Sequence, residues 1–264
     1  AMPLTIEKNV YMARLAGQAE RYEEMCTHMK EVALEMEPLG LEERNLLSVA
    51  YKNVVGARRS SLRTLASCEK SEQDWLQAGD ESAEERLMWI AGYRSGVEHE
   101  LEEVCAEVLS LIDSRLIPTN PGLRAQQEQE DAESQVFYQK MRADYFRYLA
   151  ELRGARSMED GTLAPDSIAY RAEASYKAAS KLAQTGLPPT HPIRLGLALN
   201  YAVFLHEVLR QSSEACERAK QAIDDAIAEL DCAASLDAAS YRDSTLIMQL
   251  LRDNLALWAE DRPR

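Results

Sequence analysis

One short segment concentrates positive charge in an otherwise acidic chain. The 264 residues include 30 Lys and Arg against 44 Asp and Glu, a net charge of −14, yet the stretch from Lys52 to Arg63 holds four basic residues and no acidic one. Lys52 and Arg59 are seven residues apart, or two helical turns, so a helix would project both from one face. Two such cations without an acidic partner nearby in sequence are typical of an anion site. A basic surface strip, or salt bridges between helices, would explain the same pattern.

A second cluster combines charge with aromatic residues. In the run Asp144–Tyr148, Arg147 offers a guanidinium fork that can donate two parallel hydrogen bonds, and Tyr148 offers a neutral hydroxyl donor. These groups suit an anion, but the aromatic residues taken alone are equally typical of a protein core.

The last expected helix carries an amide within an apolar stripe. Leu246, Leu250, Asn254 and Trp258 follow one another at four-residue steps and therefore share a face. A side-chain amide both donates and accepts hydrogen bonds, which is what binding an extended main chain requires. The helix expected at 192–211 repeats the pattern of apolar and polar residues on neighbouring faces, with Leu199, Val203, Asn200 and Glu207. Core packing is the alternative explanation of both stripes.

Motifs of the common enzyme classes are absent from the sequence, which has no G-x-G-x-x-G, Walker A, H-E-x-x-H or G-x-S-x-G pattern. Adjacent helical residues point about 100° apart, so pairs such as His206 and Glu207 form no metal or acid–base couple by themselves. The five cysteines show no C-x-x-C spacing, which favours reduced thiols over a zinc site or a redox motif. We therefore expect no enzymatic activity, no cofactor and no metal.

The charge balance and the hydropathy restrict the partners and the location. A surface this acidic repels nucleic-acid backbones and anionic lipids, so we expect binding to neither nucleic acid nor membrane. The longest charge-free apolar stretch, Leu195 to Leu205, has about half of the ~20 residues that a transmembrane helix needs. Glu7, Lys8 and Arg14 leave no room for the apolar run of a signal peptide, so we expect a cytoplasmic protein.

Helical periodicity runs through nearly the whole chain. Apolar residues recur at steps of three and four, and the 11 Gly and 9 Pro gather at a few breaks. The pattern predicts nine helices, at about 4–17, 20–36, 41–70, 81–116, 131–153, 166–184, 192–211, 213–232 and 240–259, with surface loops at 118–129 and 154–165. Because no fixed-period repeat or linker composition is present, we expect an all-α protein with a single domain over residues 1–264.

Four segments together resemble the 14-3-3 family, and the resemblance covers essentially the whole chain. Asn45–Ser61 is similar to the signature of the family's third helix, Pro189–Asn200 to its seventh, Asp243–Trp258 to its ninth, and Ala19–Tyr22 to its N-terminal segment. The resemblance implies nine antiparallel helices that form an amphipathic groove and dimerise through the N-terminal helices. It also implies an adaptor that clamps phosphorylated client proteins at phosphoserine or phosphothreonine to regulate signalling.

The resemblance further implies roles for individual residues. The phosphate would be held by Lys52, Arg59, Arg147 and Tyr148. The amides of Asn200 and Asn254 would bind the main chain of the peptide, assisted by Glu207 and Trp258. An apolar wall would contact its side chains, formed by Leu199, Val203, Leu246, Ile247 and Leu250. Lys140 would lie on the basic side of the groove. The dimer interface would contain Leu15, Ala19, Arg21, Glu24, Ser61, Tyr93 and Glu100, with a bridge from Arg21 to the partner's Glu100.

The sequence departs from the family pattern in ways that bear on these expectations. Insertions at 74–86, 121–130 and 153–165 predict longer surface loops. Gly96 stands where the family usually has a lysine facing Glu24, so we expect one inter-subunit ion pair to be missing and the homodimer to be weaker. Arg58–Ser61 resembles a basophilic kinase site; a phosphate on Ser61 would split the dimer, although a helix-packing role explains this serine equally well.

An alternative function from another class stays open at this point. A helical scaffold that has lost phosphate recognition would bind unphosphorylated amphipathic acidic segments. The presence of all four residues expected to hold phosphate speaks against that alternative.

Overall fold

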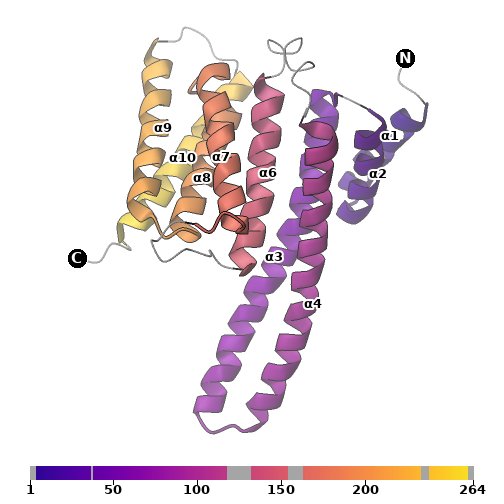
Figure 1. Ribbon diagram of the computed structural model, residues 1–264, viewed down its shortest axis with the longest axis vertical. Coiled ribbons are helices and arrows are strands. Elements are labelled where there is room, and N and C mark those ends of the chain that lie inside the picture. The colour runs from indigo at the N-terminus through magenta and orange to yellow at the C-terminus, as the bar shows by residue number, and fades with distance from the viewer. Residues whose placement is uncertain (1–3, 37, 118–131, 154–162, 233–237, 261–264) are drawn as a thin grey trace. The chain divides into compact units, whose positions relative to one another are not determined.

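The computed structural model describes residues 4–36, 38–117, 132–153, 163–232 and 238–260. The chain forms two compact units, Ala1–Leu116 and Ile117–Arg264. Within the described ranges there are nine α-helices, one short π-helical turn and no strand (Figure 1). The expected all-α fold is confirmed.

The N-terminal unit contains α1 (Leu4–Gln18), α2 (Tyr22–Glu35), α3 (Leu41–Gln77), α4 (Ser82–Leu111) and the π-helical turn η1 (Ile112–Leu116). A tight turn parts α1 from α2, and in it Glu20 adopts a positive φ of 57°. Successive helices pack on one another, α1 on α2, α2 on α3 and α3 on α4. Their apolar faces form a core that includes Met25, Met29, Leu47, Tyr51 and Leu101, each 2% exposed or less.

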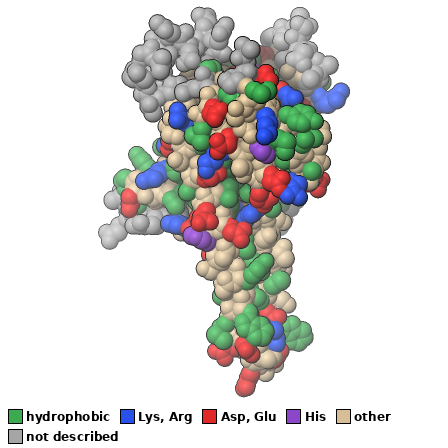
Figure 2. Space-filling view, turned by 90° about the vertical axis from the view of Figure 1, so that its right-hand side faces the viewer, with side chains coloured by type: hydrophobic (Ala, Val, Ile, Leu, Met, Phe, Trp, Pro, Cys, Tyr) green, Lys and Arg blue, Asp and Glu red, His purple; other side chains and the backbone are tan. Residues whose placement is uncertain are grey.

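Helices α3 and α4 form a long antiparallel hairpin (Figure 1). Near the turn that joins them, Arg86 bridges Glu72 and Asp80 at 2.8 Å each. Figure 2 shows hydrophobic side chains gathered at this end of the hairpin with acidic ones around them. Trp75 and Trp89, in this part of the hairpin, are 58% and 63% exposed. The insertion expected as a surface loop at 74–86 is therefore mostly helix, and it lengthens the hairpin.

The C-terminal unit contains α6 (Ala132–Arg153), α7 (Ile168–Gly186), α8 (Pro192–Glu207), α9 (Ser212–Cys232) and α10 (Ala238–Glu260). Helix α6 packs on α7, α8 packs on α9, and α10 contacts both α8 and α9. Ser167 caps α7, because its hydroxyl accepts the main-chain N–H of Tyr170 at 3.1 Å. An aromatic core joins α7 to α8 through Tyr176, Tyr201 and Phe204.

Three predicted helix ends are wrong. Helix α3 continues to Gln77 instead of ending near 70, because no Gly or Pro interrupts the sequence before Gly79, which has a φ of +96°. The helix expected over 81–116 is α-helical only as far as Leu111 and ends in η1. Helix α8 ends at Glu207 instead of 211, and Arg210 follows with a positive φ of 58°. The loop expected at 118–129 and most of that at 154–165 lie outside the described residues.

Two further observations concern membranes and metals. None of the helices in the described part of the chain combines the length and the apolar character that crossing a bilayer requires. In the same residues, no three His, Cys, Asp or Glu side chains are grouped so that they could hold a metal ion.

Candidate functional site

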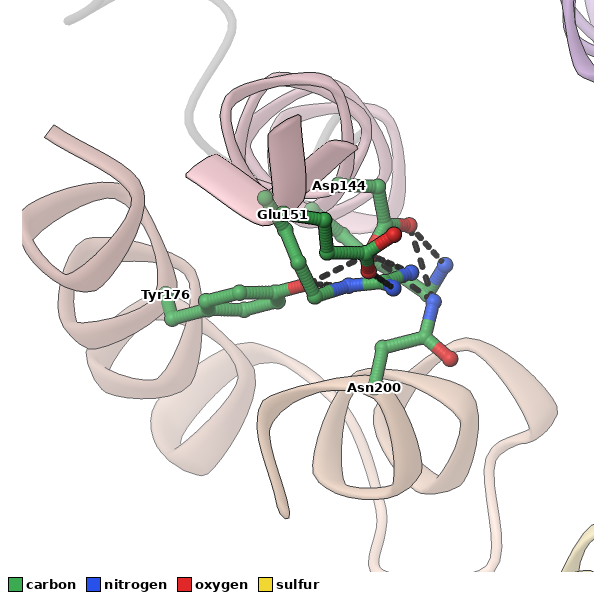
Figure 3. A network of polar contacts seen from close by, with 6 residues as sticks. Asp144, Glu151, Tyr176 and Asn200 are labelled. Atoms are coloured by element: carbon green, nitrogen blue, oxygen red, sulfur yellow. Dashed lines mark hydrogen bonds and ion pairs between the residues drawn. The ribbon is translucent and has the colours of Figure 1, made fainter. Parts of the chain in front are cut away.

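A cluster of four charged side chains lies on one face of α6, and we call it the buried cluster because its two central members, Asp144 and Arg147, are buried. Lys140, Asp144, Arg147 and Glu151 are spaced by four, three and four residues, so their side chains lie along a single face of the helix. Asp144 is 7% exposed and Arg147 is 5% exposed, which is rare for ionised residues unless they are paired. Figure 3 shows how Tyr176 of α7 and Asn200 of α8 reach into this cluster.

Asp144 is the acceptor at the centre of the cluster. One carboxylate oxygen accepts the Tyr176 hydroxyl at 2.6 Å, and the other accepts Lys140 Nζ at 2.8 Å. The side-chain amide of Asn200 donates to both oxygens at 2.9 Å (Figure 3). Burial alone would raise the pKa of Asp144, but the charges of Lys140 and Arg147 and the hydrogen bonds to the carboxylate outweigh burial and lower it. Asp144 is thus an anion that three helices hold in place.

Arg147 is fixed by its neighbours on several sides. Its Nε donates to the Tyr176 hydroxyl at 3.1 Å, and Nη1 donates to Glu151 at 2.6 Å. Its Nη2 lies 3.8 Å from Asp144, and its guanidinium carbon lies 4.5 Å from the centre of the Tyr148 ring. Burial would lower the pKa of Arg147, but the surrounding tyrosines and carboxylates raise it well above its ordinary value. The guanidinium therefore stays charged in a fixed orientation, which suits the binding of an anion.

The apolar stripe expected on α10 is only partly buried. Leu246 and Leu250 are 61% and 44% exposed, whereas Trp258 is 3% exposed and stacks on His206 of α8 at a ring distance of 4.7 Å. Ile247 and Asn254 are half-buried. On α8, the predicted contact residues are half-buried or exposed, namely Leu199, Asn200, Val203 and Glu207. Core packing therefore explains Trp258 but leaves Leu246 and Leu250 uncovered in the C-terminal unit.

The basic segment of the N-terminal unit lies on α3, where its residues differ in environment. Arg58 donates to Glu23 of α2 at 2.6 Å and to Glu100 of α4 at 3.2 Å, so for this residue the alternative of salt bridges between helices is confirmed. Lys52 is exposed and Arg59 is half-buried, and both lie on α3 as predicted. Their binding of phosphate stays a prediction.

The residues expected at a dimer interface all lie on the surface of the N-terminal unit. Leu15 is 40% exposed and Tyr93 is 68% exposed, and the other five are exposed as well, namely Ala19, Arg21, Glu24, Ser61 and Glu100. Within the chain, Arg21 donates to Glu24 at 2.8 Å, and Glu100 accepts from Arg58. A bridge from Arg21 to the partner's Glu100 could add to these contacts, because a guanidinium has five N–H groups and a carboxylate has two acceptor oxygens.

Sequence reasoning missed three members of the buried cluster. It included Asp144 in a cluster but gave it no role, and it did not single out Glu151 or Tyr176. The four-residue steps from Lys140 to Asp144 and from Arg147 to Glu151 carried a usable signal, because such pairs meet on a helix. Tyr176 carried none, since it meets Asp144 only through the packing of α7 on α6.

Comparison with known proteins gives one consistent result. The family model described as 14-3-3 protein matches residues 12–259. The chain is 50% identical to 14-3-3-like protein B of Hordeum vulgare over 98% of this chain and 90% of that protein. It is 50% identical to Protein BMH1 of Saccharomyces cerevisiae over 98% of this chain and 88% of that protein, and 51% identical to 14-3-3 protein epsilon of Drosophila melanogaster over 97% and 88%. The similarity extends across both compact units.

Proposed function

Because this chain belongs to the 14-3-3 family of phosphopeptide-binding adaptors, we propose that it clamps client proteins at phosphoserine or phosphothreonine. In this proposal Lys52, Arg59, Arg147 and Tyr148 hold the phosphate. A phosphate monoester carries a charge of about −1.5 to −2 at neutral pH and has three acceptor oxygens. Two guanidinium groups, one ammonium and one phenol hydroxyl match that charge and those acceptors.

The observation that carries the proposal is the convergence of three predicted ligand contacts on one carboxylate. Lys140, Arg147 and Asn200 were expected to contact phosphate or peptide, and all three interact with Asp144. A phosphate site needs donors that keep their orientation when no ligand is bound, because ordering them on binding would reduce affinity. The contacts of Asp144 supply that order in the C-terminal unit.

The uncovered apolar residues of α10 support binding of a peptide rather than of phosphate alone. Leu246 and Leu250 would contact side chains of an extended segment, together with Ile247 of the same helix and with Leu199 and Val203 of α8. In the proposal the amides of Asn200 and Asn254 bind the main chain of that segment, assisted by Glu207 and Trp258. Main-chain contacts do not depend on ligand sequence, so this arrangement admits many clients.

We extend the proposal to assembly and location. The chain would act as one domain in a cytoplasmic homodimer, through the surface that holds Leu15 and Tyr93. A large aromatic residue that is 68% exposed on a helix is a natural contact for a second subunit. The missing lysine at Gly96 would make this dimer weaker, and a phosphate on the exposed Ser61 would divide it.

The proposal is tested by fluorescence anisotropy with an Arg-x-x-pSer-x-Pro peptide and its unphosphorylated twin. We expect the phosphorylated peptide alone to bind. Arg147→Lys should weaken binding at least tenfold, because it keeps the charge but loses the planar fork. Arg171→Lys is the matched control, since Arg171 is exposed on α7 of the same unit.

The other outcomes separate the proposal from its alternative. Equal binding of both peptides would favour a scaffold for unphosphorylated acidic segments. No binding of either peptide, or unchanged affinity in the Arg147→Lys protein, would contradict the role given to the buried cluster.

A further inference from the structure

Glu151 differs from the central members of the buried cluster in its access to solvent. Its carboxylate accepts Arg147 Nη1 at 2.6 Å, one turn further along α6 (Figure 3). Its side chain is 24% exposed, whereas Asp144 and Arg147 are buried. A carboxylate that reaches water can be hydrated when it leaves its partner, but a buried one cannot. Of the carboxylates of Asp144 and Glu151, the second is therefore the one that can yield to an incoming anion.

Arg147 has enough other contacts to keep its orientation without Glu151. Its Nε donates to the Tyr176 hydroxyl at 3.1 Å, and its Nη2 lies 3.8 Å from Asp144. The ring of Tyr148 covers the guanidinium at 4.5 Å from the ring centre. Displacing Glu151 would free Nη1 for a new acceptor and leave these three contacts in place. Glu151 therefore competes for a donor rather than positioning it.

The charge balance of the cluster gives this competition a consequence for the ligand. Lys140 and Arg147 are balanced by Asp144 and Glu151, so the four side chains present no net charge to an anion. A carboxylate that displaces Glu151 exchanges one carboxylate at Arg147 for another and gains no contact there. A phosphate monoester brings a second negative charge and a third acceptor oxygen, so for phosphate the exchange is favourable.

We propose that Glu151 is an internal competitor for Arg147, which a client's phosphate must displace and which excludes clients that offer only a carboxylate. This inference rests on the proposed binding of phosphoserine or phosphothreonine, and it assigns the residue that sets selectivity and limits affinity. In the Glu151→Gln protein the amide oxygen would still accept the Arg147 N–H, but without a charge. The cluster would then carry one net positive charge, which favours any anion.

The test is fluorescence anisotropy of the full chain with three Arg-x-x-z-x-Pro peptides, in which z is phosphoserine, glutamate or serine. The parent protein should bind the phosphoserine peptide alone. The Glu151→Gln protein should bind the phosphoserine peptide at least tenfold more tightly, because a negative charge beside the phosphate is gone. It should also bind the glutamate peptide. Added salt should shrink both gains, whereas an effect on packing alone would not depend on salt.

Glu217→Gln is the matched control, because it removes the same charge from an exposed position on α9 of the same unit. Phosphoserine affinity that is unchanged or weaker in the Glu151→Gln protein, while the parent protein binds, would overturn the inference and leave the proposed function standing. An equal gain in the control, or binding of the glutamate peptide by the parent protein, would also overturn it. A parent protein that binds none of the three peptides would contradict the proposed function and this inference together.

Discussion

Replacing Asp144 by asparagine removes the charge at the centre of the buried cluster while keeping the shape of the side chain. Asp144 accepts hydrogen bonds from Lys140, Tyr176 and Asn200 and lies 3.8 Å from Arg147. Asparagine keeps one acceptor oxygen but replaces the other with an NH2 group. That NH2 group would face hydrogen-bond donors, so at least one of the present hydrogen bonds would be lost. Two cations would also lose a counter-charge that is buried with them.

The magnitude follows from the burial of the cluster. Exposed ion pairs contribute about 0–1 kcal/mol, but breaking a buried pair by removing one partner costs about 3–5 kcal/mol, because it leaves a buried charge uncompensated. Asp144 and Arg147 are 7% and 5% exposed, so the larger figure applies. For a chain of this length the loss corresponds to a fall of roughly 10 °C in the thermal midpoint.

The effect should depend on pH in a defined direction. The pKa of Asp144 is lower in the folded protein than the value of about 3.9 expected in the unfolded chain. Such a group stabilises the fold fully above the unfolded pKa, and its contribution is lost as the pH falls through the folded pKa. The midpoint difference between the parent protein and the Asp144→Asn protein should therefore be full at pH 7 and shrink below about pH 4.

Thermal unfolding followed by circular dichroism at pH 7 and at steps down to pH 3 measures both effects. Asp224→Asn is the control, because Asp224 is exposed on α9 and its replacement should change stability by no more than about 0.5 kcal/mol. Equal midpoints for the parent and the Asp144→Asn protein at pH 7 would refute the assignment of Asp144 as the centre of the cluster. A difference that persists unchanged at pH 3 would refute the electrostatic explanation.

Three further predictions concern single residues. Gly96→Ala should raise stability by up to ~1 kcal/mol in chemical denaturation, because a Cβ on this helical glycine meets nothing within 4 Å; a loss would contradict that open environment. At pH 8, Cys68 should react with iodoacetamide well before Cys26, because Cys68 is exposed and burial raises the pKa of Cys26 to about 12. Mass spectrometry of the labelled peptides measures the order, and labelling of Cys26 first would contradict the prediction. Lys52→Ala should weaken phosphopeptide binding without changing the thermal midpoint, because Lys52 is exposed. Arg147→Ala should lower both the affinity and the thermal midpoint, because Arg147 is buried. Peptide titration measures the affinities, and scanning calorimetry measures the midpoints.

Most of the fold could be predicted because its signals are local. Steps of three and four between apolar residues, and the few places where Gly and Pro gather, predicted all nine helices within the described ranges. The errors lie where no local signal stops a helix, as in α3, or where the backbone changes without Gly or Pro, as at Arg210. The prediction of a surface loop at 74–86 was wrong, because polar composition indicates exposure but not the type of structure. An exposed helix is as polar as a loop.

The site was predictable only in part. Resemblance to a family pointed to Lys140, Arg147 and Asn200, although only Asn200 stands in one of the long matching runs. What orients them could not be deduced from those runs, because the contacts of Asp144 with Tyr176 and Asn200 span 32 and 56 residues. Such contacts depend on how α6, α7 and α8 pack, and a single sequence does not show that packing.

The charges on α6 explain how Asp144 and Arg147 can be buried at all. Lys140 and Arg147 are balanced by Asp144 and Glu151, so the four side chains are neutral together and need no ligand to stay folded. A neutral cluster has little net attraction for a dianion, however well its donors are oriented. If the chain binds phosphate as proposed, the excess positive charge must come from outside this cluster, and Lys52 and Arg59 belong to the one segment with four basic residues and no acidic one. In that case α6 would orient the donors and α3 would supply the net attraction for phosphate. Substitutions on α6 should therefore change stability, and substitutions of Lys52 or Arg59 on α3 should change affinity.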